Sequence, residues 1–451
     1  MNSLKNNPQN GSQHDSGLNM LNIQPLIFDL SYENEHIGHA SIIIPAAIIN
    51  TLYLEASLSQ KTYTQAFGFN KGEVPLEYIA SNFKVNLIEH IKEFLFKFFV
   101  VDFLLEQIHT KKLLVAGEPR LIEVTVELNQ PARFKFELSL FDSIGIQEWK
   151  YLPFKSPKRK NYKELDLQVD MFVKEEQGFL KNADLTTLAV GDWVNFKVNL
   201  LNNTNTPLFN AHTTSLWLKL GDEEIDNTFH DIFLNKTIGS CFTTTSKSLQ
   251  DYFSNLIDTN YTFSIEITDI LKNNFFCLDS FKRHFRLKTN KEMHQKLIEV
   301  FSYRNDLSLR RSMAEESLKL LLSKHRFVIP NYLILRQQEV VLDSIKQNSD
   351  YHVYRMQKDF KERIRQLAEK QLRETLFLNQ LAYHEELEVS DSDLKGYLNL
   401  TNRPRMKDFL YFDAPETKVH GQEIPLSTQE LKQFNLREKT LNHIIYHLMK
   451  K

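Results

Sequence analysis

Residues 68–75 of the chain read GFNKGEVP. Glycine permits backbone angles that other residues avoid and proline fixes φ, so this stretch predicts a bent but firm turn with Phe69 and Lys71 at an exposed tip. Residues 79–108 follow and read IASNFKVNLIEHIKEFLFKFFVVDFLLEQI. They predict one long helix, because apolar residues recur in steps of four and three along one face. These residues are Leu87, Ile91, Phe94, Phe98, Val101, Leu105 and Ile108.

Length and composition are those of an ordinary multidomain protein. The chain has 451 residues, too many for one core, and we expect about two to four domains. The formal net charge of −2 excludes a chain-wide surface for polyanions. Only Cys241 and Cys277 are present, so we expect neither a disulfide framework nor a zinc site, and a reducing cytoplasmic setting. No cofactor and no metal are expected.

The N-terminus and the most hydrophobic segment both argue against membrane targeting. Residues 1–20 are polar and lack the apolar core of a signal peptide, which predicts a disordered tail. Residues 94–105 are interrupted by Lys97 and Asp102, and no uncharged apolar run of about 18 residues occurs, so no membrane span is expected. Glycine is scarce at 13 residues, which favours long helices over barrels rich in tight turns.

The rest of the chain divides by pattern into four parts. Residues 21–145 predict an α+β domain, with strands near 39–44, 121–128 and 134–140 and a helix through 46–58. Residues 146–185 predict a linker or arm, with a basic run at 155–163 and an amphipathic helix at 166–183. Residues 186–270 predict a small β-rich domain, with strands at 193–200, 216–220 and 262–267. Residues 271–451 are helical in pattern, apart from an irregular insert at 403–425 that contains several prolines.

Two helix starts are marked inside the last part. Pro330 is expected in the first turn of one helix, where its missing N–H costs nothing. Ser390 is expected as the N-cap of another, with Asp393 three residues on as a near capping box.

The order of these elements resembles bacterial trigger factor, a family of chaperones that meet nascent chains at the ribosomal exit tunnel. The resemblance rests on the Gly-Phe-x-Lys-Gly-x-x-Pro loop, LVAGEP at 114–119, VIPNYL at 328–333 and VSDSDL at 389–394. None of these motifs is decisive alone, but together they cover residues 22–451 in the family's order. The resemblance implies a multidomain α+β fold: an α+β ribosome-binding domain, an FKBP-like β-rich domain and a mostly α-helical chaperone domain.

The β-rich part resembles FKBP-type prolyl isomerases through LAVGDWV at 188–194, LKLG at 218–221 and YTFSI at 261–265. Such enzymes twist the prolyl amide in a dry aromatic pocket. The pocket walls implied here are Phe209, Trp217, Ile225, Phe229, Tyr252 and Phe263. The family's Ile-Pro-Gly-Phe-Glu element falls on 226–230, where only the phenylalanine is kept, and its acidic strand position falls on Lys197. We favour the interpretation that these side chains form a simple core and that isomerase activity is weak or lost.

The loop implies a ribosome-docking site, although by itself it is also typical of an ordinary surface turn. The residues implied are Gly68, Phe69, Asn70, Lys71, Gly72 and Pro75. The family usually has arginine at the position of Asn70 and a basic residue at that of Glu73. Asparagine cannot make a charged, forked contact with phosphate or carboxylate, so docking is expected to be weaker here.

The function expected from the resemblance is that of a chaperone that works without ATP, since no Walker A loop and no GxGxxG motif occurs. Its partners would be the ribosome, through exit-tunnel proteins and rRNA, and nascent or unfolded polypeptides; a homodimer is left open. The resemblance also implies roles in protein export and cell division. Three alternatives remain: an active peptidyl-prolyl isomerase, a ribosome-independent holdase or assembly chaperone, and a structural scaffold of long helices.

Overall fold

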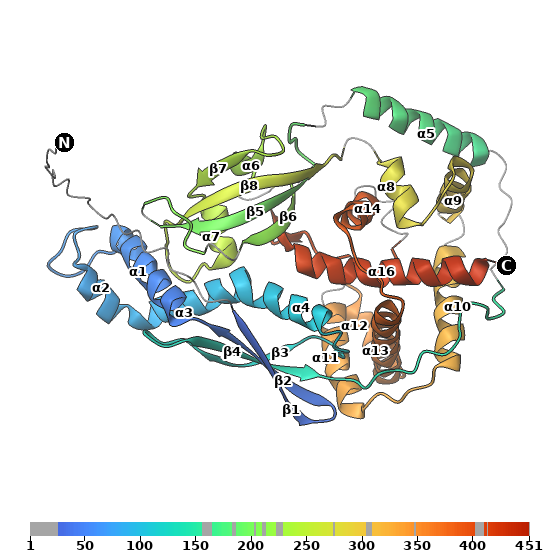
Figure 1. The fold of residues 1–451 in the computed structure, drawn as a ribbon, viewed down its shortest axis with the longest axis horizontal. Coiled ribbons are helices and arrows are strands. Elements are labelled where there is room, and N and C mark those ends of the chain that lie inside the picture. The colour runs from blue at the N-terminus through green and yellow to red at the C-terminus, as the bar shows by residue number, and fades with distance from the viewer. Residues whose placement is uncertain are drawn as a thin grey trace, which may run out of the picture.

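The structure is a computed structural model that describes residues 26–155, 165–182, 186–202, 204–209, 213–221, 229–273, 276–303, 309–346, 349–401, 410–412 and 414–450. Helices and antiparallel sheets alternate in several packed units (Figure 1), so the expected multidomain α+β fold class is confirmed. The predicted tail at 1–20 and most of the basic run at 155–163 lie outside the described residues.

The first unit is a four-stranded antiparallel sheet in the order β1-β2-β4-β3. Its strands are β1 (Ile27–Asn34), β2 (Ile37–Ile44), β3 (Arg120–Thr125) and β4 (Ala132–Ser139). Side chains alternate across the sheet, so Ile42, Phe134 and Phe136 are buried against the helices. The three strands expected in this region are confirmed, and β1 is a fourth that the sequence analysis does not predict.

The helices that follow correct the prediction of one uninterrupted helix. They are α1 (Ala46–Tyr63), α2 (Leu76–Asn82), α3 (Lys84–Leu95), the π-helical segment η1 (Phe96–Val100) and α4 (Val101–Thr110). The chain breaks at Phe83, with φ −102° and ψ 11°, and then runs without interruption from α3 to α4. The wider π turn shifts the buried face. Val100 at the end of η1 and Leu104 beyond it are buried, whereas the predicted Val101 and Leu105 are only half-buried.

The second unit, here called the central β unit, comprises residues 186–273. It contains β5 (Trp193–Leu201), β6 (Thr214–Lys219), α6 (His230–Phe233), β7 (Cys241–Thr244), α7 (Lys247–Phe253) and β8 (Thr262–Leu271). The three strands expected there are confirmed. Its sheet has the order β11-β6-β5-β8-β7, and the outer strand β11 (Leu426–Ser427) comes from near the C-terminus.

Residues 403–425 are less irregular than expected where the structure describes them. Here β9 (Lys418–Val419) and β10 (Gln422–Glu423) form a small hairpin. Its turn residues His420 and Gly421 both have positive φ, at 52° and 84°, as two-residue hairpin turns require. Residues 402–409 and 413 lie outside the described ranges.

Helices make up most of the remaining chain. They are α5 (Leu165–Asn182), α8 (Leu278–His284), α9 (Asn290–Tyr303), α10 (Leu309–Lys324), α11 (Asn331–Lys346), α12 (Tyr351–Tyr354), α13 (Phe360–His384), α14 (Asp391–Thr401) and α16 (Thr428–Met449). Helix α16 runs through the middle of the molecule and contacts α4, α10, α13 and α14 (Figure 1). The predicted capping box is confirmed, because Ser390 and Asp393 bond each other reciprocally at the start of α14. The helix predicted near Pro330 is present, but it begins at Asn331, so Pro330 directly precedes its first turn instead of lying in it.

The largest buried cluster joins the N-terminal sheet, the α3–α4 helix and the central β unit into one continuous core. A strap after β4 then ties this body to the helices: the Ile144 amide donates to Gln380 over 3.1 Å, and the buried Trp149 indole donates to Glu385 over 3.2 Å. Among the described residues, none of the helices is both long enough and apolar enough to cross a lipid bilayer.

Candidate functional site

The loop between α1 and α2 is held by its own backbone. The Gly72 amide donates to the carbonyl of Thr64 over 3.3 Å, and the Phe69 amide donates to that of Ala66 over 3.0 Å. Gly68 and Gly72 have φ of 88° and 84°, a region that other residues rarely adopt. Added side chains there would meet no neighbour within 4 Å, so the glycines serve the backbone angles and not close packing.

The tip of this loop presents aromatic and cationic side chains to solvent. Phe69 is 39% exposed and lies 6.0 Å from the ring of Tyr78, and the Lys71 ammonium sits 5.9 Å above the ring of Tyr63. Below the tip, Val74 is fully buried and anchors the loop to the core. Phe67 is completely exposed, and the sequence reasoning did not single it out. Its position beside Gly68, two residues before Phe69, is the signal that could have identified it.

The two residues that depart from the trigger factor pattern are bonded to each other. The Asn70 side-chain amide donates to the Glu73 carboxylate over 2.8 Å, and the Glu73 amide donates to the Asn70 carbonyl over 3.1 Å. This pair closes the turn between Phe69 and Val74. The negative charge of Glu73 therefore lies within two residues of Lys71 and reduces the local positive potential.

Of the six residues proposed as walls of a prolyl pocket, the five that the structure describes are divided between two hydrophobic clusters. Phe209, Phe229 and Phe263 are fully buried in the core cluster shared with the long helix, and Tyr252 packs against that cluster. Trp217 belongs to a different cluster, which also contains Leu426 of β11. Ile225 lies outside the described residues. These placements support the simple-core interpretation.

The structure also shows the surroundings of Lys197, which stands where the isomerase pattern has an acidic residue, and of the next residue on the strand. Lys197 is exposed on β5 and lies 3.9 Å from the carboxylate of Glu266, while Val198 is buried in the core. In the described ranges, no group of three or more His, Cys, Asp or Glu is arranged to hold a metal ion.

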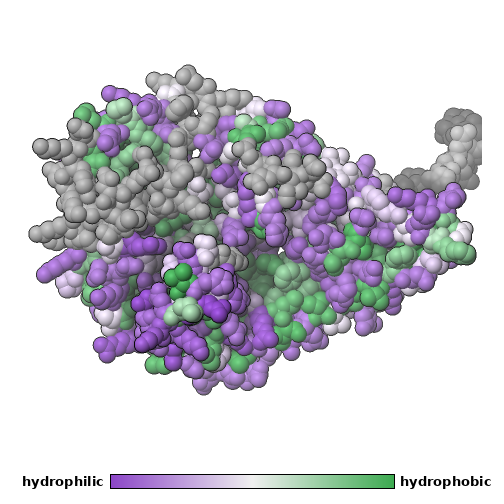
Figure 2. Space-filling view, turned by 180° about the vertical axis from the view of Figure 1, so that it is seen from behind, coloured by the Kyte–Doolittle hydropathy of each residue, from purple (hydrophilic) through white to green (hydrophobic). Residues whose placement is uncertain are grey.

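A second candidate region is an apolar hollow of about 370 Å³ between the N-terminal sheet and the helices. Figure 2 shows hydrophobic side chains gathered around a hollow near the middle of the rear face. The apolar walls are Phe96, Val101, Leu104, Leu105, Phe136, Val340, Leu372 and Phe434. This volume lies in the range typical of ligand sites. Because apolar contacts are non-directional, such walls accept guests of varied sequence.

Charged and amide side chains also line the same hollow. Burial lowers the pKa of the Arg437 guanidinium, and the charge of Glu118 partly opposes this shift. The Arg437 Nε has no hydrogen-bond partner among the described residues. Burial also raises the pKa of Glu430, and the nearby Glu118 adds to that shift. Gln337, Gln371 and Gln433 supply neutral donors and acceptors. The hollow therefore offers polar partners for a peptide backbone between apolar walls.

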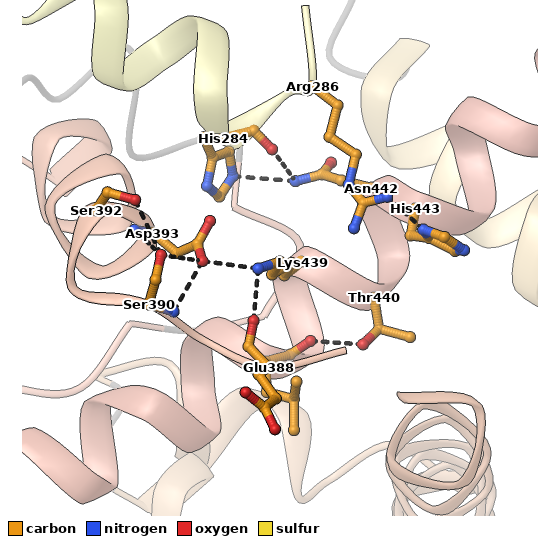
Figure 3. Close-up of polar contacts among 11 residues, drawn as sticks. His284, Arg286, Glu388, Ser390, Ser392, Asp393, Lys439, Thr440, Asn442 and His443 are labelled. Atoms are coloured by element: carbon orange, nitrogen blue, oxygen red, sulfur yellow. Dashed lines mark hydrogen bonds and ion pairs between the residues drawn. The ribbon is translucent and has the colours of Figure 1, made fainter. Parts of the chain in front are cut away.

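Helix α16, which lines the hollow, is joined to α14 and α8 by polar side-chain contacts (Figure 3). The Asp393 carboxylate accepts hydrogen bonds from the Ser390 hydroxyl at 2.7 Å and from the Lys439 ammonium at 2.7 Å, which joins the start of α14 to α16. Asn442 on α16 meets the His284 ring over 3.1 Å. Burial lowers the pKa of His284 to about 3 and that of His443 to about 4, and neighbouring arginines act in the same direction. Both rings therefore stay neutral at physiological pH.

Comparison with known proteins places the chain in one family. The family model described as bacterial trigger factor protein matches residues 32–171, and the one for the trigger factor C-terminus matches residues 288–403. Trigger factor of Geotalea uraniireducens (strain Rf4) is 21% identical over 337 residues, which cover 72% of this chain and 77% of that protein. Trigger factor of Geobacter sp. (strain M21) is 20% identical over 384 residues, which cover 81% of this chain and 85% of that protein.

One solved structure comes from work on "Promiscuous Substrate Recognition in Folding and Assembly Activities of the Trigger Factor Chaperone". It aligns with 93% of this chain and 100% of its own, with 12% identity and a TM-score of 0.36. The family assignment rests on the two family models and the curated relatives. The chain is a divergent member of the trigger factor family.

Proposed function

We propose that the protein is a cytoplasmic, ATP-independent chaperone of newly synthesised proteins that docks on the ribosome near the exit tunnel. The observation that carries this proposal is the exposure of Phe67, Phe69 and Lys71 at the tip of the loop. Backbone hydrogen bonds and the buried side chain of Val74 hold this tip in one conformation. A firm, partly apolar tip loses little conformational entropy on docking. Removal of Phe69 and Lys71 is expected to abolish binding to ribosomes.

We also propose that the apolar hollow holds unfolded segments of client proteins. Burying one large apolar side chain contributes about 1.5–3 kcal/mol, so two contribute roughly 3–6 kcal/mol. The entropy lost on association offsets much of this gain, so the net affinity for a client segment is low. Weak, non-directional binding of this kind suits transient holding of many clients. Prolyl isomerase activity is proposed to be weak or lost.

The holding function is tested by suppression of aggregation of a chemically unfolded model client without ATP. Val340→Asp places a charge on the hollow at a side chain that is 49% exposed, so the fold is expected to tolerate it. Ile238→Asp is the matched control, because Ile238 is 48% exposed in the central β unit, away from the hollow. We expect Val340→Asp to suppress aggregation several-fold less well than the control. Equal activity of the two variants would contradict a role for the hollow.

A ribosome-independent holdase is the second candidate function. The bond between Asn70 and Glu73 favours it, because the loop uses these two side chains internally and keeps a carboxylate beside its cation. Aggregation suppression without any ribosome binding would support this alternative.

A further inference from the structure

We propose that the central β unit is an internal brace: it joins the long N-terminal helix to α16, and its aromatic face receives Phe98 and Phe99 of the same chain in place of a prolyl peptide. The aromatic face is defined by Phe209, Phe253, Tyr261 and Phe263. This proposal does not depend on ribosome docking or on client binding.

The aromatic face and the long helix interlock through their rings. Phe98 lies 5.9 Å from Phe209 and 4.9 Å from Phe253, and Phe99 lies 4.9 Å from Phe209 in an edge-on arrangement. One turn earlier, Phe94 contacts Phe253 at 5.4 Å and Tyr261 at 5.6 Å. All six rings are at least 95% buried. The helix thus fills the space against the sheet that a prolyl substrate would need.

Polar contacts fix the register of this interface. The buried His90 ring bonds the Ser254 hydroxyl at 3.0 Å and the Tyr261 hydroxyl at 2.8 Å, and the Ser254 hydroxyl donates to the Glu93 carboxylate at 2.7 Å. Undocking would expose the rings and break these bonds together. Buried polar groups that lose their partners are costly, so the contacts favour one docked position.

Backbone groups on both sides take part as well. The Lys97 ammonium donates to the carbonyl of Tyr252 over 3.0 Å and pairs with Glu93 at 3.0 Å. Thr214, the first residue of β6, donates its hydroxyl to the carbonyl of Phe98 within the π turn. The π turn, which the sequence pattern did not foresee, therefore lies where the central β unit meets the helix.

The outer strand of the same sheet reaches the C-terminal helix. Leu426 of β11 pairs with Trp217 of β6, and Ser427 is the N-cap of α16. The Ser427 hydroxyl also bonds the carboxylate of Asp102 on α4. A further hydroxyl pair, Ser215 with Thr428, lies at 2.9 Å. The same sheet therefore contacts both the α3–α4 helix and the start of α16, and Ser427 bonds the two helices to each other, which is the geometry of a brace.

The proposal is tested in the full-length chain by pulsed electron paramagnetic resonance. One spin label goes on the native Cys241, which is exposed on β7, and the other on Val85→Cys, which is exposed on α3, in a Cys277→Ser background. A control pair, Val85→Cys with Lys111→Cys in a chain lacking both native cysteines, spans the continuous α3–α4 helix and gives the width for a rigid body. We expect one distance distribution as narrow as the control. A broad or multiple distribution would overturn the brace.

Two further measurements test whether the aromatic face is occupied. The wild type is expected to give no acceleration of prolyl isomerisation in a protease-coupled peptide assay, and turnover comparable to an active FKBP-type enzyme would overturn the proposal. Phe98→Asp puts a charge between the rings and is expected to broaden the distance distribution; an unchanged narrow distribution would overturn the role of Phe98. If this variant does not fold, the wild-type distribution and the isomerase assay decide the matter by themselves.

Discussion

The hydroxyl of Thr214 donates a hydrogen bond of 2.5 Å to the backbone carbonyl oxygen of Phe98, across 116 residues of sequence. Phe98 lies in the π-helical segment of the long N-terminal helix, and Thr214 begins a strand of the central β unit. The bond is buried, so neither group has water as an alternative partner. A local irregularity of the helix is thereby coupled to the position of a separate sheet.

Thr214→Val is expected to lower the free energy of unfolding. Valine keeps the shape of threonine but cannot donate, so the Phe98 carbonyl loses a buried partner, at a cost of about 1–3 kcal/mol. Urea unfolding measures the effect. Thr243→Val is the control, because Thr243 is exposed on β7 and its substitution is expected to change stability by less than about 0.5 kcal/mol. Equal stability of the two variants would show that the bond contributes nothing.

Stability should fall in acid partly because of His90. Burial lowers the pKa of this histidine to about 4, an effect that the Glu93 carboxylate opposes, whereas an unfolded histidine titrates near 6.5. The unfolded chain therefore binds the proton first, and stability is lost as pH falls from about 6.5 towards 4. The contribution of one such group is on the order of 3 kcal/mol.

His90→Gln is expected to flatten this acid slope in urea unfolding carried out between about pH 7 and pH 4. His284 and His443, whose pKa values are also lowered, keep part of the slope. His352→Gln serves as the control, because His352 is exposed on α12 and should leave the slope unchanged. A His90→Gln slope identical to that of the wild type would contradict a neutral, buried His90.

Ribosome binding should be strengthened by restoring the basic residues that the family usually carries. Asn70→Arg/Glu73→Lys removes the internal side-chain bond of the loop and makes the tip more positive. Each additional phosphate contact increases affinity and makes it more sensitive to salt. Gln338→Arg/Glu339→Lys on α11 makes the same change in charge away from the loop and is the matched control. Equal ribosome binding by both variants would assign any gain to overall charge and not to the loop.

The sequence predicted the regular elements well where local pattern decides them. Periodicity located most strands and helices, and the capping box at Ser390 and Asp393 was correct to the residue. Local sequence pattern did not predict features that depend on contacts with residues far away in the sequence. The π turn at Phe96–Val100 shifts the predicted stripe, and Thr214 is one of its partners. The strand Leu426–Ser427 is too short to show any alternation and exists because it pairs with β6.

In the candidate site, too, local sequence predicted the features that local residues determine, but not those that depend on distant segments. Glycine and proline spacing predicted the bent loop and the exposure of Phe69 and Lys71. Residue type alone could not separate Trp217 from Phe209, because both are aromatic and buried. Only the folded structure shows that Phe209 packs in the core shared with the long helix and Trp217 in the cluster beside β11. The hollow around Val340 is built from several segments that are distant in sequence, so no local motif could predict it.

The most direct test of the proposed function is co-sedimentation of the protein with bacterial ribosomes at low and high salt. The comparison is between wild type, Phe69→Ala/Lys71→Ala in the loop, and Lys84→Ala/Val85→Ala, which removes an exposed lysine and an exposed apolar residue from α3. We expect salt-sensitive binding of the wild type and of the α3 variant, and loss of binding by the loop variant. Absence of wild-type binding, or full binding by the loop variant, would contradict docking through this loop.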